Sequence, residues 1–324
     1  MEQHSKIINY SVEWRDKLRR YMINRFPIHS EAYIDYCLDH STDRIPSKLV
    51  INDNDDVVGC HLYYCTKVLV KGVEVETHWG HDTFLDKEYR AERGLDLMLS
   101  INSVKDGFGL GLTDINSKLQ KKLRNIFFEG VYTYYTISWK AFLSPFQKYF
   151  GDHSALYKKE DLKVGKHVFR RIDDAETMTI PNNGYWFNGS RDIDFIRDAS
   201  FLNQRFVKNK VHKYYLYACK ENEDICYFVV RKVMFKGFPA LTLSDFRYTN
   251  PKMVSLILRA VKKYAALSQL GIILFICGDK NIDKNMEGKL HYRKDNNIFI
   301  GYRGLTSDMS YCITGADADA DFLK

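Results

Sequence analysis

Residues Thr83–Leu97, TFLDKEYRAERGLDL, mark a change in the periodicity of the chain. Upstream, over Val73–Leu85, the pattern is that of a β-strand. Downstream, one face with helical spacing carries Leu95, Met98, Leu99 and Asn102. A strand that turns directly into a helix places backbone N–H groups at the positive end of the helix dipole, where an anionic phosphate can bind. The stretch therefore predicts an α/β domain with an anion site at this corner.

Two helices and three strands are predicted before the corner. The helices cover residues 13–26 and 30–40, and Ser30 can cap the second one. The strands cover residues 48–51, 57–70 and 73–85, and the turn Lys71-Gly72 joins the last two. This order predicts an antiparallel meander of three strands.

Helices and strands alternate after the corner. We expect a helix over residues 89–104, a buried strand over 108–113, a helix over 117–127 and a strand over 131–139. The second half repeats this order loosely, with a helix over 194–206, strands over 214–220, 225–233 and 240–245, a helix over 250–270 and a strand over 272–277. Asn250-Pro251 is a good start for the last helix. The repeated order indicates an internal duplication.

A chain of 324 residues is about twice as long as a usual single domain. Residues 158–166 are polar and charged without clear periodicity, which suits a linker or a swapped edge segment. We therefore expect two domains, residues 1–160 and 161–324. No phosphate loop precedes the helix over 250–270, so the first domain should hold the anion site and the second should shape a substrate groove.

The corner resembles motif A of the GCN5-related N-acetyltransferase (GNAT) superfamily, V-x-P-E-Y-R-G-K-G-I-G, which cradles the pyrophosphate of acetyl-CoA. The resemblance implies an α/β (α+β) fold of two tandem GNAT-like domains, each with a mixed, mainly antiparallel sheet flanked by helices. It also implies that Phe84 and Leu85 contact the pantetheine of the cofactor. By the same resemblance the phosphate loop consists of Arg90, Ala91, Glu92, Arg93, Gly94 and Leu95.

The corner departs from the family pattern. When the two are aligned on Gly94, the Arg and the second Gly of the family fall on Ala91 and Asp96. When they are aligned on Arg90, Arg93 stands where the family has Gly. The side chain of Arg93 could obstruct the approach of the backbone to a phosphate, and the carboxylate of Asp96 would repel it. The domain therefore binds the cofactor in a modified loop or does not bind it.

Two further motifs resemble tandem GNAT and Fem-type proteins of bacterial polysaccharide loci, which show F-L-x-W-R-[FY] and a closing W-x-[IL]-T-x-G-D-x-D. Here residues 201–206 read FLNQRF and residues 310–319 read SYCITGADAD. Gln204 and Tyr311 replace the usual tryptophans. This resemblance implies an acceptor such as an amino sugar or its nucleotide-linked form.

Transfer of an acyl group to an amine requires a neutral amine and a proton donor for the leaving thiolate. GNAT enzymes commonly place the base on the strand before the corner and a Tyr acid near the pantetheine. Candidates for the base on this strand are Glu76, His78, His81 and Asp82, of which His81 and Asp82 lie closest to the strand end, and Tyr134 is the candidate acid. Strict alternation puts Glu76, His78 and Asp82 on one face of the strand and His81 on the other. Because these side chains then cannot converge, we expect no metal site.

Composition restricts the setting of the protein. A net charge of +7 suits a phosphate-bearing ligand, but the basic residues are spread along the chain, so a nucleic-acid footprint is not expected. Seven cysteines without a C-x-x-C pair indicate a reducing compartment rather than a disulfide framework. Residues 1–10 lack an apolar signal region, and the apolar run over 271–277 is too short to span a membrane. We therefore expect a cytoplasmic protein without a membrane span.

The sequence favours an acyl-CoA-dependent N-acyltransferase that uses acetyl-CoA as co-substrate and a small amine as acceptor. Two alternatives stay open. A Fem-type aminoacyltransferase would use charged tRNA, which the positive charge permits and which predicts steep salt dependence. A catalytically silent GNAT-like binding module would explain the departures in the phosphate loop.

Overall fold

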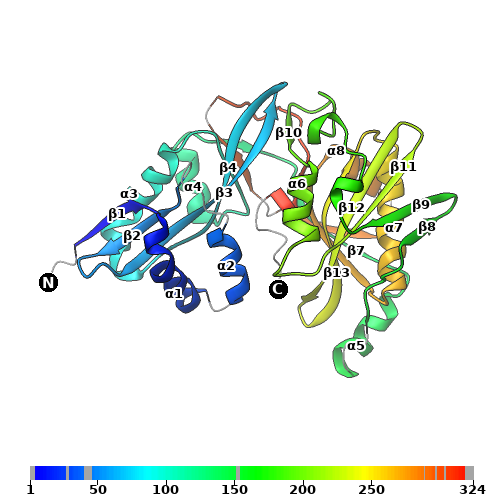
Figure 1. The fold of residues 1–324 in the computed structure, drawn as a ribbon, viewed down its shortest axis with the longest axis horizontal. Coiled ribbons are helices and arrows are strands. Elements are labelled where there is room, and N and C mark those ends of the chain that lie inside the picture. Colours follow the sequence, from blue (N-terminus) through cyan, green and yellow to red (C-terminus); the bar gives the residue numbers. More distant parts are fainter. Residues whose placement is uncertain are drawn as a thin grey trace. The chain divides into compact units, whose positions relative to one another are not determined.

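The computed structural model describes residues 4–26, 29–39, 46–150, 154–287, 289–295, 298–302 and 304–317. Its contacts divide the chain into two compact units (Figure 1). The first comprises Met1–Val68, Glu74–Phe127 and Phe299–Ser307, and the second comprises Leu69–Val73, Phe128–Ile298 and Asp308–Lys324. The chain therefore passes between the units several times. In particular, the predicted strand over 131–139 lies in the second unit, and residues 299–307 return to the first.

The first unit contains a mixed sheet and four α-helices within its described residues. Its helices are α1 (Arg15–Arg25), α2 (Glu31–Asp39), α3 (Arg90–Ser103) and α4 (Asp114–Lys122). Its strands, in the order in which they lie in the sheet, are β1 (Ser5–Asn9), β2 (Lys48–Asn52), β3 (Val57–Val70), β4 (Val73–Leu85), β5 (Gly107–Leu110), β16 (Phe299–Gly301) and β6 (Ile126–Phe128). The predicted meander is thus β2, β3 and β4.

The helices of the first unit cover both faces of its sheet. Leu85, at the end of β4, packs with Leu97 of α3, whereas the ring of its neighbour Phe84 contacts Tyr21 of α1 and Phe26. Because neighbouring side chains of a strand point to opposite faces, α3 and α1 lie on opposite sides of β4. A ligand held at the end of β4 is therefore accessible to two different layers of side chains.

The second unit contains a larger sheet. Its strands in spatial order are β15 (His291–Lys294), β7 (Tyr132–Ile137), β14 (Ile272–Gly278), β13 (Phe238–Tyr248), β12 (Asp224–Phe235), β11 (Tyr215–Glu221), β9 (His167–Ile172) and β8 (Asp161–Val164). The short β17 (Ile313–Thr314) pairs with β14, and β10 covers Ile193–Phe195. The helices are α5 (Ser144–Phe150), α6 (Ala199–Leu202), α7 (Met253–Leu267) and α8 (Lys280–Met286).

The predicted duplication is visible in the topology. In each unit a three-stranded meander is followed by a helix and a strand parallel to the last strand of the meander, β4–α3–β5 in one and β13–α7–β14 in the other. Even the turns correspond. Lys71-Gly72 and Lys236-Gly237 both have two successive positive φ angles, 51° and 81° in the first pair and 52° and 80° in the second, as a two-residue type I′ hairpin requires. The predicted fold class is confirmed.

In the second unit one sequence prediction needs correction, and residues 158–166 form an edge segment rather than a linker. The segment predicted as a helix over 194–206 begins as β10, and helical structure starts only at Ala199, because the carboxylate of Asp198 accepts a hydrogen bond from the Phe201 amide at 2.7 Å and caps it there. The charged stretch 158–166 contains the edge strand β8, which pairs with β9. Charged side chains are tolerated on such a strand because they protect a sheet edge from further pairing.

All seven cysteines are free thiols, six of them buried. Among the helices of the described residues, none combines the length and the apolar character that crossing a bilayer requires.

Candidate functional site

A cavity of about 450 Å³ lies in the first unit where β4 and β5 diverge. The two parallel strands pair at His78 with Gly107 and at Trp79 with Phe108, and β4 then continues to Leu85. Gly80 and Thr83 of β4 line the cavity together with residues 107–109. The later turns of α3 and one side of α4 form its other walls, through Met98, Ile101, Asn102, Asn116 and Gln120. Parallel strands that separate in this way leave room for an extended ligand between them.

Three buried rings stand side by side at the floor of this cavity. Tyr63 contacts His61 and His78 edge to face, with ring centroids 4.7 and 4.6 Å apart. Glycine on the neighbouring strands makes room for both imidazoles, since a Cβ at Gly80 would lie 2.7 Å from the His61 ring and a Cβ at Gly107 would clash with His78. His61 Nδ1 contacts the Thr83 hydroxyl at 2.6 Å. The three rings thus form a closely packed aromatic floor in which His61 Nε2 and His78 Nδ1 are buried without a hydrogen-bond partner among the described residues.

Both imidazoles are held neutral. Burial, together with the neighbouring His81 and His78, lowers the pKa of His61 to about 3, and burial lowers the pKa of His78 to about 4. These values lie below the pKa of about 6.5 that histidine has in an unfolded chain. At pH values between the unfolded pKa and the folded pKa, the imidazoles of the unfolded chain are protonated and those of the folded protein are not. The folded state therefore loses stability as the pH falls through this range.

We predict that the free energy of unfolding falls by about 2 kcal/mol per buried imidazole between neutral pH and about pH 5. Replacing His78 by Phe should remove about 2 kcal/mol of the total loss. Urea unfolding at the two pH values measures it, with His4→Gln, a change of an exposed imidazole, as the control. An H78F protein that loses as much stability as the wild type would contradict the prediction.

A second cluster surrounds Asp82 on the α1 and α2 side of β4. The Asp82 carboxylate contacts His29 Nε2 at 3.0 Å and His81 Nδ1 at 3.1 Å, and it accepts a hydrogen bond from the Tyr33 hydroxyl at 3.2 Å. Only 6% of the Asp82 side chain and 8% of the His81 side chain are exposed. Burial opposes the ionisation of Asp82, but the hydrogen bonds from His29 and His81 outweigh it and hold the pKa of this carboxyl below its usual range. Asp82 is therefore an anion that orients two imidazoles.

The predicted alternation along β4 is wrong at this point. Asp82 has a φ of +46°, and this left-handed residue turns its side chain to the same face as that of His81. His78 points instead to the cavity on the α3 side. His81 and Asp82 therefore converge, contrary to the predicted alternation, whereas His78 stays apart from them.

This convergence also brings Cys37 of α2 to the cluster. One ligand atom each of Cys37, His81 and Asp82 lies within 4.8 Å of the others, and these donor types are ones that Zn²⁺ uses. Both oxygens of Asp82 already accept hydrogen bonds from His29, His81 and Tyr33, so the arrangement is that of a hydrogen-bonded carboxylate.

The predicted phosphate loop lies inside a helix. A 3₁₀ turn over Lys87–Tyr89 leads directly into α3, so Arg90, Ala91, Glu92, Arg93, Gly94 and Leu95 form its first turns. Arg90 Nε donates to the Leu85 carbonyl at 2.8 Å, and Arg93 contacts Glu92 and Asp96 at 2.7 and 3.2 Å. Leu95 and Leu99 are exposed, although the helical pattern put them on one face with the cavity-lining Met98. The residues of this segment do not line the cavity.

The remaining candidates are not members of the Asp82 cluster. Glu76 is an exposed residue of β4, six residues and therefore about 20 Å along the strand from Asp82. Tyr134 belongs to the second unit, where its buried ring stacks on Phe275 and its hydroxyl donates to Asp283 at 2.6 Å.

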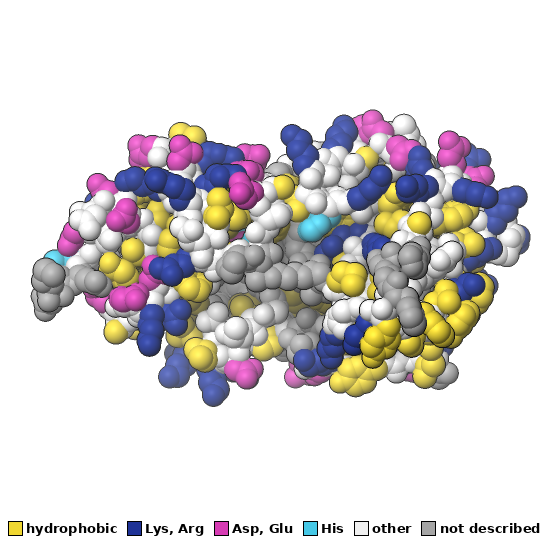
Figure 2. Space-filling view, turned by 90° about the horizontal axis from the view of Figure 1, so that it is seen from below, with side chains coloured by type: hydrophobic (Ala, Val, Ile, Leu, Met, Phe, Trp, Pro, Cys, Tyr) yellow, Lys and Arg dark blue, Asp and Glu magenta, His cyan; other side chains and the backbone are white. Residues whose placement is uncertain are grey.

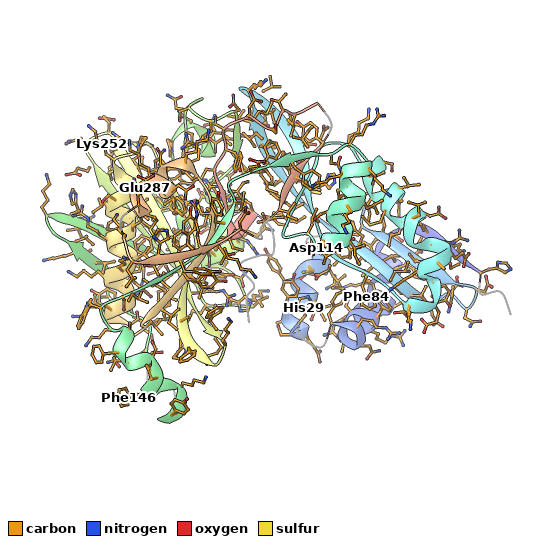
Figure 3. The ribbon with its side chains drawn as sticks, turned by 180° about the vertical axis from the view of Figure 1, so that it is seen from behind. His29, Phe84, Asp114, Phe146, Lys252 and Glu287 are labelled. Carbon is orange, nitrogen blue, oxygen red and sulfur yellow. The ribbon has the colours of Figure 1, made fainter. Side chains whose placement is uncertain are left out.

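Sequence reasoning missed the partners of Asp82. His29 and Tyr33 are four residues apart, which is about one helical turn. Ser30, Tyr33 and Cys37 also follow helical spacing, and this pattern could have indicated that α2 has a polar side. Figure 3 labels His29 at the start of this helix and Phe84 near the end of β4. No pattern in the sequence connects α2 with β4, so only the fold brings these side chains together.

In the second unit the corresponding opening is filled by the chain itself. β13 and β14 pair from Ala240 with Ile272 to Thr242 with Leu274 and then separate. Beyond these pairs β17 bonds to the end of β14, and the Thr314 hydroxyl donates to Asp245 of β13 at 2.6 Å. The described part of the closing motif therefore places Ile313 and Thr314 between the two strands.

A buried ionic network fixes this segment. Asp245 contacts Arg197 and Arg247 at 2.9 Å each, and Asp317 binds the same two guanidinium groups. All four side chains are at most 1% exposed. The Tyr227 hydroxyl donates to Asp245 at 2.7 Å. Within the described residues, the opening between β13 and β14 is therefore filled, whereas the first unit keeps a cavity between β4 and β5.

The architecture is that of known acyltransferases. No protein-family model and no curated protein matches the sequence. Among solved structures, the GCN5-related N-acetyltransferase of Anabaena variabilis aligns with 91% of this chain and 72% of its own at 11% identity, with a TM-score of 0.57. The one from Kribbella flavida covers 92% of this chain and 71% of its own at 11% identity and a TM-score of 0.58. The chain has a GNAT fold.

The same fold extends to a longer-chain acyltransferase. The N-myristoyltransferase of Saccharomyces cerevisiae, solved with bound myristoyl-CoA, aligns with 92% of this chain and 82% of its own at 8% identity and a TM-score of 0.57. At such identities the likeness concerns the arrangement of helices and strands. A GNAT fold alone does not specify a reaction, so function has to be argued from the residues of the site.

Proposed function

We propose that this protein is an acyl-CoA-dependent N-acyltransferase whose cofactor binds in the first unit. The observation that carries the proposal is the cavity between the diverging β4 and β5, which contrasts with the filled opening between β13 and β14. The extended pantetheine arm of a coenzyme A thioester suits a space between two separating strands. The start of α3 lies outside the cavity, and its positive dipole end would hold the diphosphate at the far end of the extended cofactor.

The acyl group would reach Asp82 from the cavity by passing beside the end of β4, where Thr83, the neighbour of Asp82, lines the cavity. Asp82 stays ionised and holds His29 and His81, so that one of these imidazoles acts as the base that removes a proton from the amine. Phe84 and Leu85 are the proposed contacts of the cofactor at the end of β4, and Arg90 fixes this end by its bond to the Leu85 carbonyl. Tyr134 and Glu76 have no part in this proposal.

We further propose acetyl-CoA as the donor and a small amine as the acceptor, in the first place an amino sugar, free or linked to a nucleotide. The resemblance of residues 201–206 and 310–319 to proteins of polysaccharide loci supports this acceptor, and the net charge of +7 favours a ligand with phosphates. A panel of amino sugars and nucleotide-linked amino sugars, assayed for release of free CoA thiol, tests it.

Binding of acyl-CoA is the first test. We expect acetyl-CoA at about 100 times its dissociation constant to stabilise the protein by about 2.7 kcal/mol, seen as a rise of the melting temperature. Met98→Trp, which enlarges a side chain of the cavity wall, should abolish the rise. Leu99→Trp, at the exposed neighbouring position of α3, should leave it unchanged.

One observation favours a second candidate, a catalytically silent GNAT-like binding module. The segment that resembles the phosphate loop is helical, and the Arg93 guanidinium is already paired with two carboxylates. If neither acetyl-CoA nor longer acyl-CoAs raise the melting temperature of the wild type, this candidate replaces the enzyme.

A further inference from the structure

The second unit exposes four large aromatic side chains between the end of β7 and the end of α5. The exposed fractions are 69% for Trp139, 59% for Phe142, 60% for Phe146 and 76% for Tyr149. Residues of this kind are usually buried for most of their surface, and their gathering on an exposed segment marks an interaction site. We call these four side chains the α5 aromatic surface. Figure 3 labels Phe146 on α5, which projects from the rest of the second unit.

Lysine side chains accompany these rings. The Lys140 ammonium lies 4.1 Å from the ring centroid of Trp139, and the Lys148 ammonium lies 5.9 Å from that of Tyr149. Residues 131–150 contain these two lysines and neither Asp nor Glu. Figure 2, seen from the side of α5, shows hydrophobic and basic side chains next to each other on the second unit. The surface is therefore both apolar and positively charged.

We propose that the α5 aromatic surface binds the interfacial layer of a membrane that carries anionic phospholipids. Trp and Tyr favour the depth of the lipid headgroups, where the ring is in an apolar layer and its polar edge meets water. Lysine can lay its aliphatic stem along such a ring while its ammonium reaches a lipid phosphate. The net charge of +7 adds a long-range attraction to a negative surface.

The chemistry of the surface favours a membrane over a protein partner. The centres of protein–protein interfaces are depleted of lysine and use arginine instead, whereas each cation on this segment is a lysine. α5 has only seven residues, so it would lie in the interface rather than cross the bilayer. Binding of this kind is peripheral and reversible.

Sedimentation of the full chain with vesicles tests the proposal. We expect binding to vesicles made of equal parts phosphatidylcholine and phosphatidylglycerol, and much weaker binding to phosphatidylcholine alone. The double variant W139S/F146S should bind the anionic vesicles at least about tenfold more weakly. The charge variant K140E/K148E should lose the preference for anionic vesicles, as should the wild type at high ionic strength.

The matched control is L95S/L99S, which removes two exposed apolar side chains from α3 in the first unit and should bind like the wild type. Circular dichroism verifies that each variant is folded. Absence of wild-type binding to both vesicles, or equal loss in W139S/F146S and the control, would overturn the proposal. A wild-type dimer in solution that W139S/F146S converts to a monomer, without vesicle binding, would also overturn it and assign the surface to a second copy of the chain.

Discussion

Replacing Asp245 by alanine is expected to lower the free energy of unfolding by about 3–5 kcal/mol, because two buried guanidinium groups lose their shared partner. Asp245 is fully buried and contacts both Arg197 and Arg247. Burial alone would raise the pKa of its carboxyl, but the two arginines outweigh burial and keep this pKa low. The ion pairs are therefore formed at neutral pH, and removal of the carboxylate leaves uncompensated positive charge in the core.

The loss should be much larger than that at a surface ion pair of the same unit. Asp173→Ala removes the partner of Arg171, at 2.7 Å, but the Asp173 side chain is 72% exposed, so we expect a change of at most about 1 kcal/mol. Chemical unfolding of both variants, followed by circular dichroism, measures the difference. If D245A were no less stable than D173A, the network would not be what holds β17 between β13 and β14.

The fold could largely be predicted because its signals are local. The meander β2–β3–β4 follows from strand patterns and from the turn at Lys71-Gly72, and α7 follows from its apolar face behind Asn250-Pro251. The exchange of segments between the units could not be predicted. β7 has the same alternating pattern whichever sheet it joins, and nothing within residues 132–137 identifies β14 as its neighbour.

The site was less predictable for the same physical reason. The motif at the corner led to β4 and to Asp82 and His81, which the structure brings together with His29. It also led to residues 90–95, which continue the helix, because Ala91 and Arg93 are good helix formers where the family has glycine. The left-handed φ of Asp82 cannot be read from an Asp between His and Thr, although Asp is among the residues that adopt it most readily.

Asp82→Asn is expected to slow acyl transfer by about 100-fold or more while leaving acyl-CoA binding unchanged, because general-base catalysis contributes roughly 10²–10⁴-fold. An imidazole that donates a proton to Asp82 keeps a lone pair on its other ring nitrogen, and that lone pair can take the proton of the amine. Asparagine accepts with one atom and donates with the other. It would therefore force one of His29 and His81 into the opposite tautomer. This expectation rests on the proposed function.

The design of the variant separates this role from a structural one. Asparagine tolerates the φ of +46° at this position, so the backbone of β4 should be preserved. The control is Asp86→Asn, a buried carboxylate of the same unit that accepts bonds from Tyr21 and Arg25 and contacts neither imidazole. Measuring kcat and KM with the acyl-CoA melting shift distinguishes turnover from binding, and His29→Gln and His81→Gln show which ring is the base. Equal kcat in D82N and D86N would contradict the assignment. Loss of wild-type activity on treatment with a chelator would also contradict it, and would indicate that Cys37, His81 and Asp82 are ligands of a metal ion.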